Sequence, residues 1–343
     1  MAQRAGNPAA VPAMVPAPRP AGLCAALLAG AEAHPQRVVL RDAGDRAAWC
    51  GRPAITWTYA AAAEIVGRLA RGFGAWRLPP GSRIGLWFSG GAEAALAHCA
   101  VEAAGHLPCP MPAAWDAAAL SAAVEAADLA AVLTEGRRGA RRPAEELTVA
   151  ALRHFGLRYL AAFGPGVPDG VISLDALALE RGGAEPAASR GLVTFAGGAP
   201  DRPVHRAAEA LAEAVAAHLD PVPLAGGERL LTLLPPHDLR GLVTGLGAAL
   251  AAGATLESLI PFDAAALRAA LARPVPTRLV VPAPFEAALD GLVLPWTVRA
   301  LDLVHRAPAA RAAAPPAGPD RGAGPRRLDV VVHGEDAVLT RPR

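Results

Sequence analysis

The sequence contains no lysine, because all 33 of its basic residues are arginine. An arginine side chain stays protonated and is a poor nucleophile or base. This absence excludes Schiff-base chemistry, a phosphate-binding P-loop lysine and any adenylation that depends on a lysine. The acidic residues number 31, so the formal net charge is only +2. Such a balance indicates no strongly charged partner.

Aromatic residues and cysteines are also scarce. Aromatic side chains make up 4% of a chain that is 53% hydrophobic, so the core is expected to consist mainly of Leu, Val and Ala. The four cysteines, Cys24, Cys50, Cys99 and Cys109, form no Cys-x-x-Cys pair and have no histidine at metal-ligand spacing. We interpret them as reduced, structural cysteines of the cytoplasm.

The chain lacks an uncharged run long enough to cross a bilayer. The longest such run, residues 241–256, is too short and is rich in Gly and Ala. Residues 21–31 are apolar but show no convincing signal-peptide cleavage site. The only dense basic cluster, residues 137–142, is interpreted as a solvated loop and not as a nucleic-acid surface. We therefore expect a soluble cytoplasmic protein with no membrane span and no nucleic-acid partner.

Apolar strands and amphipathic helices alternate along the chain. Thr58 can cap a long helix over residues 59–76, and residues 84–88 form a continuous apolar strand typical of a buried sheet. This alternation predicts an α/β fold with two layered subdomains, whose mostly parallel sheets are flanked by helices and meet near Gly197. The predicted division is a disordered leader (1–20), a first subdomain (21–190), a second subdomain (191–308), and a linker with a terminal strand and tail (309–343).

A glycine-rich stretch near residue 197 is the strongest candidate for a site. Residues 192–195 are predicted to form a buried strand, residues 196–203 a loop, and residues 206–219 a helix. A strand, a glycine-rich loop and a helix in this order present backbone N–H groups to phosphate. For His205 and Arg206 a solvated first turn is the alternative. The candidate phosphate-loop residues are Thr194, Gly197, Gly198, Pro203, His205 and Arg206.

Several segments taken in order resemble the adenylate-forming superfamily, which includes acyl-CoA synthetases, luciferases and peptide-synthetase adenylation domains. They are Thr58-Tyr59 at the start of a helix, Pro80-Gly81-Ser82-Arg83-Ile84 before a strand, residues 102–108 after a helix, Arg229-Leu230-Leu231-Thr232-Leu233-Leu234-Pro235, residues 241–255 and residues 277–282. The resemblance covers about residues 20–308. It implies the large N-terminal domain of an acyl-CoA synthetase, with ATP or AMP and CoA as cofactors.

The functional motifs of that superfamily match poorly. Its phosphate loop, Tyr-Thr-Ser-Gly-Thr-Thr-Gly-x-Pro-Lys-Gly, falls on residues 195–205, where only Gly198 and Pro203 agree. Val204 stands at the lysine position, and Asp201 adds a carboxylate where ATP would bring negative charge. Backbone N–H groups remain, but the charge-assisted contacts that strengthen anion binding are missing.

The motifs near adenine and Mg²⁺ are also altered. The family's Gly-Gly-Ala-Pro stretch falls on residues 305–308, so Ala307 and Pro308 are adenine-region candidates, while His305 and Arg306 replace two glycines. The Mg²⁺-binding Glu has no matching residue near residues 333–339. The ribose-binding Asp segment and the small C-terminal domain of the family are missing from this sequence.

Residues after Pro235-Pro236 are acyl-pocket candidates, because the family often has an aromatic–His pair there. These candidates are His237, Asp238 and Gly241. An exposed loop pair is the alternative interpretation of His237 and Asp238.

Three functions follow from the resemblance. The first is a degenerate homologue that binds a small acyl or nucleotide ligand with weak or no acyl-adenylating activity. The second is an active carboxylate–CoA ligase, completed by a separate small domain or using Arg202 or Arg206 as the replacement cation. The third is a non-catalytic protein that docks on a synthetase or a carrier protein.

Overall fold

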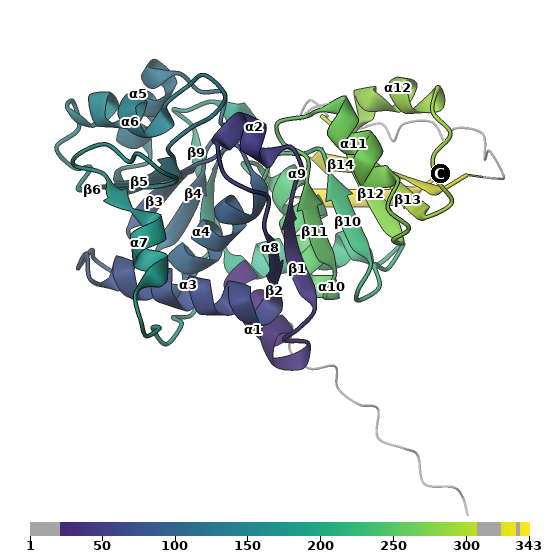
Figure 1. Ribbon diagram of the computed structural model, residues 1–343, viewed down its shortest axis with the longest axis horizontal. Helices are drawn as coiled ribbons and strands as arrows, with labels where there is room; N and C mark the ends of the chain where they lie inside the picture. The colour runs from purple at the N-terminus through teal and green to yellow at the C-terminus, as the bar shows by residue number, and fades with distance from the viewer. Residues whose placement is uncertain (1–20, 307–323, 334–336) are drawn as a thin grey trace, which may run out of the picture.

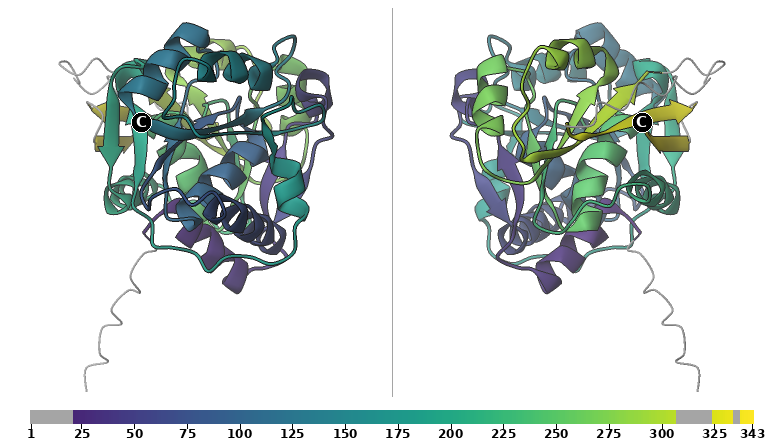
Figure 2. Two further views of the ribbon diagram at one scale, coloured as in Figure 1. Left: turned by 90° about the vertical axis from the view of Figure 1, so that its left-hand side faces the viewer. Right: turned by 90° about the vertical axis from the view of Figure 1, so that its right-hand side faces the viewer.

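The computed structural model describes residues 21–306, 324–333 and 337–343. Two sheets stand side by side, with helices between them and on their outer faces (Figure 1). The predicted leader and most of the predicted linker lie outside the described residues. The first helix lies at the bottom of the molecule in all three ribbon views (Figure 2).

The larger sheet has eight strands. Its inner strands run parallel, and its two edge strands pair antiparallel with their neighbours. In spatial order the strands are β15 (Ala337–Pro342), β14 (Arg326–His333), β13 (Val298–His305), β12 (Thr277–Pro282), β10 (Arg229–Thr232), β11 (Thr255–Ser258), β1 (Val38–Asp42) and β2 (Thr56–Thr58).

The second sheet has five strands, all of them parallel. In spatial order they are β4 (Leu107–Pro110), β3 (Arg83–Trp87), β5 (Leu129–Glu135), β6 (Tyr159–Phe163) and β7 (Ile172–Ser173). A separate antiparallel hairpin consists of β8 (Leu192–Phe195) and β9 (Pro203–Arg206). The predicted α/β class with mostly parallel sheets is therefore confirmed.

Helices cover both sheets, and several begin where the sequence predicts. Thr58 caps α3 as expected, because its Oγ1 accepts a hydrogen bond from the Ala61 N–H at 3.2 Å. The α-helices are α1 (Leu23–Ala33), α2 (Arg46–Cys50), α3 (Tyr59–Gly74), α4 (Gly91–Ala103), α5 (Ala117–Ala126), α6 (Pro143–Ala151), α7 (Leu174–Leu179), α8 (Ala208–Leu219), α9 (Leu239–Gly241), α10 (Ala248–Ala252), α11 (Ala264–Leu271) and α12 (Glu286–Asp290). The short helical turns are η1 (Ala196–Gly198), η2 (Leu242–Gly247, a π-helix) and η3 (Ala283–Phe285).

Helix α4 lies in the centre of the molecule, between the two sheets (Figure 1). Every residue from Ala92 to Ala103 is buried. The helix is rich in alanine, and small side chains allow strands to approach it from both sides. It belongs to one continuous core that includes side chains of both sheets. The centre of the fold is therefore also the boundary between the sheets.

Three expectations need correction. Residues 203–206 form strand β9, so the helix that was predicted from residue 206 begins at Ala208. Helices α2, α6 and α7 and the strand β15 were not predicted, because their short runs carry little periodicity. The expected boundary at residue 190 does not separate the sheets, because β1 and β2 pair with β11 in the larger one.

Two further expectations concern the cysteines and membrane-spanning helices. The four cysteines are free and buried. Among the described residues, no helix is both long enough and apolar enough to span a bilayer.

Candidate functional site

The glycine stretch connects two antiparallel strands and not a strand to a helix. Leu192 pairs with Arg206 and Phe195 pairs with Pro203, which closes the hairpin. Gly197 and Gly198 have positive φ angles of 63° and 75°, so the turn favours glycine at both positions. The predicted helix N-terminus is therefore not part of this loop.

The candidate residues of the hairpin divide between its two faces. Thr194 is fully buried, and its Oγ1 accepts a hydrogen bond from Arg206 Nε at 2.8 Å. His205 is exposed, with its Nε2 3.1 Å from the carbonyl oxygen of Arg190. Successive side chains of a strand point to opposite faces. Arg206 is thus a buried hairpin residue and not the cation at a helix N-terminus, which corrects the prediction.

The carbonyl groups of both loop glycines are held by side chains from other elements. Trp115, which follows β4, donates from Nε1 to the Gly198 oxygen at 3.2 Å. Arg306, which follows β13, donates from Nη2 to the Gly197 oxygen at 3.1 Å. Sequence reasoning missed Trp115 and treated Arg306 only as a bulky replacement for glycine.

Two arginines of the basic cluster contact the segments around Trp87 and Trp115. Arg141 donates from Nη2 to the Trp115 carbonyl at 3.1 Å. The guanidinium of Arg138 lies 4.9 Å from the ring centre of Trp87, and its Nε is 2.6 Å from Glu135 Oε1. Both arginines are partly buried and bonded. The prediction of a wholly solvated basic loop is therefore wrong for these two residues.

A cavity of about 30 Å³ lies between α4 and the two sheets. His237 and Gly241, two of the three acyl-pocket candidates, line this cavity. Asp238 instead caps α9, because its Oδ1 accepts a hydrogen bond from the Gly241 N–H at 3.0 Å. Other lining residues come from α4 (Ala94, Ala95, His98), η2 (Leu242, Gly245, Leu246) and the central strands (Thr232, Leu256, Ser258).

Unusual backbone geometry shapes one wall of the cavity. The π-helix η2 provides several of the lining residues, and π-helical turns are frequent at functional sites. A Cβ atom on Gly241 would lie 1.9 Å from the Pro235 carbonyl oxygen. Glycine is therefore required where the chain enters this wall.

His237 connects the cavity with the glycine hairpin electrostatically. Burial lowers the pKa of His237, Asp238 opposes the shift, and the charges of Arg240 and Arg306 lower the pKa further. His237 is therefore neutral at pH 7. Arg306 thus acts on the charge of His237 and also contacts the Gly197 oxygen of the hairpin.

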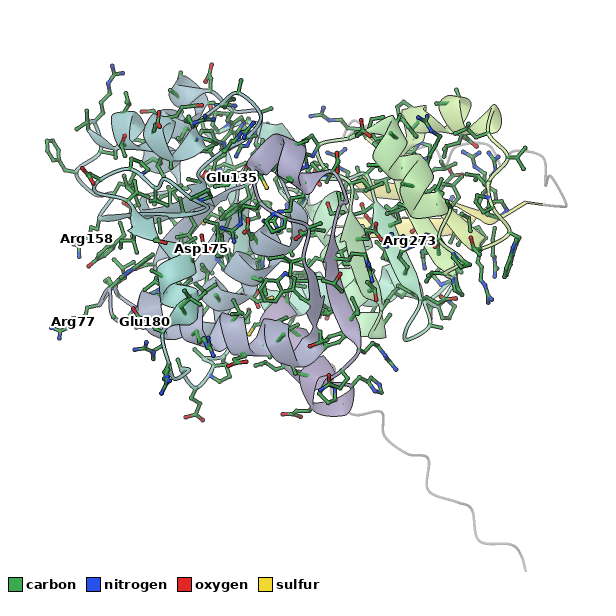
Figure 3. All side chains as sticks on the ribbon, viewed as in Figure 1. Arg77, Glu135, Arg158, Asp175, Glu180 and Arg273 are labelled. Carbon is green, nitrogen blue, oxygen red and sulfur yellow. The ribbon has the colours of Figure 1, made fainter. Side chains whose placement is uncertain are left out.

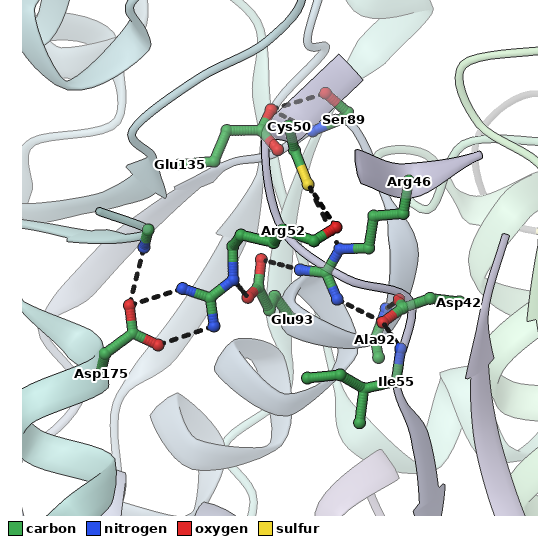
Figure 4. A network of polar contacts seen from close by, with 11 residues as sticks. Asp42, Arg46, Cys50, Arg52, Ile55, Ser89, Ala92, Glu93, Glu135 and Asp175 are labelled. Carbon is green, nitrogen blue, oxygen red and sulfur yellow. Dashed lines mark hydrogen bonds and ion pairs between the residues drawn. The ribbon is translucent and has the colours of Figure 1, made fainter. Parts of the chain in front are cut away.

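Buried charged side chains hold the start of α4 (Figure 4). Asp42 accepts a hydrogen bond at Oδ1 from the Ala92 N–H at 3.1 Å and also pairs with Arg46. Arg46 Nη2 lies 2.6 Å from Glu93 Oε2. Burial raises the pKa of Glu93 although its arginine neighbours oppose the shift.

The same network continues into the smaller sheet. Arg52 Nε lies 2.8 Å from Glu93 Oε1, and its two terminal nitrogens contact Asp175 at 2.7 and 2.8 Å. Asp175 also accepts a hydrogen bond from the Gly164 N–H at 2.7 Å. Asp175 and Glu135 lie within the molecule, whereas Arg77 and Arg158 extend outward (Figure 3). We call Asp42, Arg46, Glu93, Arg52 and Asp175 the α4 network.

Only part of the expected nucleotide site lies in the described part of the chain. Ala307 and Pro308 lie outside the described residues, as do residues 334–336 near the expected Mg²⁺ position. His305 is described, and its Nε2 lies 2.7 Å from Asp329 Oδ1. Within the described part of the chain, no group of three or more His, Cys, Asp or Glu side chains is arranged to hold a metal ion.

Comparison with known proteins shows what this chain is similar to. Residues 28–169 match the family described as AMP-binding enzyme. The fold as a whole is that of the large domain of adenylate-forming enzymes. The predicted resemblance to this superfamily is therefore confirmed.

Individual solved structures show the same fold at low sequence identity. A candidate long-chain-fatty-acid CoA ligase from Rhodopseudomonas palustris CGA009 has a TM-score of 0.73 and 18% identity, over 94% of this chain and 78% of that one. MbtA from Mycobacterium smegmatis has a TM-score of 0.73 and 20% identity, over 93% and 58%. Acetoacetyl-CoA synthetase from Streptomyces lividans has a TM-score of 0.70 and 15% identity, over 93% and 54%.

The chain therefore spans little more than half the length of the last two proteins. A search of curated proteins found no match.

Proposed function

We propose that this protein binds a small acyl or nucleotide ligand and has weak or no acyl-adenylating activity. His237 lines the cavity at α4, and Arg306, whose charge acts on His237, contacts the Gly197 oxygen of the glycine hairpin. The observation that carries the proposal is the state of Thr194, the only hydroxyl side chain in residues 194–206. This side chain is fully buried and hydrogen-bonded to Arg206.

Adenylation needs groups that stabilise charge on the transferred phosphoryl group. Without lysine and with Thr194 turned inward, the hairpin offers few such groups. We infer ATP, AMP and CoA as ligands only from the resemblance to ATP-dependent relatives. A cytoplasmic location and a protein partner likewise stay predictions.

Arg306 supports a second candidate, an active carboxylate–CoA ligase that uses an arginine at the loop. Its guanidinium has five N–H groups, and one of them contacts the Gly197 oxygen. The remaining N–H groups suit a phosphate that lies over the hairpin. Of the two cations first considered, Arg206 donates from Nε to Thr194 Oγ1 inside the hairpin, and Arg202 is exposed.

ATP–pyrophosphate exchange with the full chain, Mg²⁺ and a panel of acids tests the two candidates. We expect exchange at the rate of the enzyme-free blank, together with acid binding detected by ligand-observed NMR. Exchange above the blank that is lost in Arg306→Ala would favour the ligase. If no acid of the panel binds, the proposed function is wrong.

A further inference from the structure

A groove of about 750 Å³ lies between α1 and α8, and α10, which packs against both helices, completes it. Small-molecule sites in proteins have volumes of about 300–1,000 Å³, so this groove has room for a whole ligand. The cavity at α4, at about 30 Å³, has room for about one water molecule. We call the larger space the α1–α8 groove.

The α1–α8 groove lies at the opposite edge of the larger sheet from the glycine hairpin. Arg37 and Gly253, which line the groove, come just before β1 and β11. Arg306, which contacts the hairpin, follows β13, and these strands run parallel within the sheet. In Figure 1, α1 and α10 accordingly lie on the lower side of the molecule and β9 on the upper side. The groove is therefore separate from the candidate site, which lies at the carboxyl ends of the strands, where ligands of open α/β sheets ordinarily bind.

Small apolar side chains leave the space between the helices unfilled. The lining alanines are Ala26 and Ala29 of α1, Ala212 and Ala216 of α8, and Ala251 of α10. Walls of this kind gain from covering by methylene groups, whereas a ligand rich in polar atoms would lose its hydrogen bonds to water there. The walls therefore favour an aliphatic chain.

Close helix packing forms the groove before any ligand arrives. A Cβ atom on Gly30 would lie 2.2 Å from Tyr59 Cε1, and one on Gly247 would lie 2.6 Å from Val215 Cγ2. Glycine is thus required where α1 packs on Tyr59 and where the helix leading into α10 packs on α8. A preformed groove lowers the cost of ordering the site when a ligand binds.

Charged side chains gather at one end of the groove, where three helices end. His34 follows α1, Asp220 follows α8 and Gly253 follows α10. Arg37 is half-buried among them, and its Nη1 donates to the Gly253 oxygen at 3.2 Å. In the described part of the chain, no acidic side chain forms an ion pair with Arg37.

The balance of charge at this end favours an anion. Helix C-termini carry partial negative charge, and Asp220 adds a full one, but Asp220 is exposed to water. The half-buried charge of Arg37 is screened less. Only one of the five N–H groups of its guanidinium is used by Gly253, and the others suit a carboxylate.

We propose that the α1–α8 groove binds a single aliphatic chain that ends in a carboxylate, with the chain along the alanine-lined walls and the carboxylate at Arg37. Lining residues extend along α1 from Leu23 to His34, a rise of about 16 Å, which suits a chain of medium length. The inference goes beyond the proposed function and does not depend on it, because the two sites lie at opposite edges of the sheet.

Ligand-observed NMR titration of the full chain with hexanoate, dodecanoate and dodecyltrimethylammonium, all below their micelle concentrations, tests the proposal. We expect one dodecanoate per chain, bound at least about tenfold more tightly than hexanoate, because each buried methylene group adds to the affinity. Dodecyltrimethylammonium has the same chain and the opposite head charge, so it should bind more weakly than dodecanoate.

Two neighbouring alanines of α8 locate the binding. Ala216 lines the groove, whereas Ala217 is exposed and lies outside the lining. Ala216→Leu should fill part of the space and weaken dodecanoate binding at least about tenfold. Ala217→Leu should leave it unchanged, and unfolding by urea compares the folding of the two variants.

Arg37→Gln tests the carboxylate. We expect dodecanoate to bind about three- to fivefold more weakly, as for a partly exposed ion pair, without any loss for dodecyltrimethylammonium. The control is Arg158→Gln, because Arg158 extends outward from the smaller sheet (Figure 3) and should affect neither ligand.

The outcomes separate this inference from the proposed function. Equal binding of the two dodecyl ligands, or unchanged dodecanoate binding in Arg37→Gln, would contradict the carboxylate at Arg37. Dodecanoate binding that persists in Ala216→Leu would contradict the groove as its location, and no dodecanoate binding at all would overturn the inference. A ligand of the candidate site should bind Ala216→Leu as it binds the unchanged protein, so the proposed function is tested independently.

Discussion

The α4 network and the cavity wall both lie against α4, and their buried polar side chains differ in their hydrogen bonds and ion pairs. In the α4 network every charged group contacts an opposite charge, from Asp42 through Arg46 and Glu93 to Arg52 and Asp175. In the cavity wall, Ser258 Oγ has no hydrogen-bond partner in the described protein, whereas His98 Nε2 lies 3.4 Å from Glu102 Oε1. The α4 network holds the start of the helix, whereas the buried hydroxyl of Ser258 stays unpaired within the described protein. Substitutions in the two groups should therefore have opposite effects on stability.

The largest expected effect comes from removing a cation of the α4 network. Arg46→Met leaves Asp42 and Glu93 buried without the charge that lies between them. We expect a loss of about 3–5 kcal/mol in the free energy of unfolding, measured by urea denaturation. The control is Arg71→Met, because the Arg71–Glu180 pair is largely exposed and should contribute about 1 kcal/mol or less. Equal losses in both variants would contradict a structural role for the network.

A smaller effect of opposite sign is expected in the cavity. Ser258→Ala removes a buried hydroxyl that has no partner, so the free energy of unfolding should stay the same or rise by about 1 kcal/mol. The matched control is Thr232→Val on the same wall. The Oγ1 of Thr232 accepts a hydrogen bond from the Leu234 N–H at 3.0 Å, so its loss should destabilise the protein by about 1 kcal/mol or more. Clear destabilisation by Ser258→Ala would show that this hydroxyl has a structural partner.

This contrast also explains what the sequence could and could not predict. The sequence located the bounds of β8, because residues 192–195 form a short apolar run that a glycine-rich stretch follows. It failed at β9, whose four residues carry too little pattern to separate a strand from the first turn of the following helix. Pairing with Leu192, a long-range contact, decides the conformation of Arg206.

The candidate site shows the same limit. Local sequence drew attention to Gly197, His237 and Gly241, because glycine pairs and a histidine after two prolines stand out. It could not identify Trp115 or Arg306, which reach the hairpin from the ends of strands in two different sheets. His98 and Ser258 lie far apart in the sequence, and each alone is unremarkable. Only the positions of α4 and β11 bring them to one cavity.

The smallest expected effect concerns the charge at the cavity rim. Burial lowers the pKa of His237, with Arg240 and Arg306 acting in the same direction and Asp238 against them. The free protein therefore holds a neutral His237 at pH 7 and charges it only below the usual range near 6.5. A bound carboxylate favours the charged form, so its binding takes up a proton. The dissociation constant of a bound carboxylic acid should thus fall as the pH drops below 6 and stay constant above 7.

Between pH 7 and pH 5 the affinity for the acid should increase by about fivefold at most, because a partly exposed ion pair contributes about 1 kcal/mol or less. The acid stays largely ionised over this range, since carboxyl pKa values lie near 4. NMR titrations at intervals of half a pH unit would measure the effect. In His237→Gln the dissociation constant should not change with pH. A pH dependence that survives in His237→Gln would contradict His237 as the group that takes up the proton.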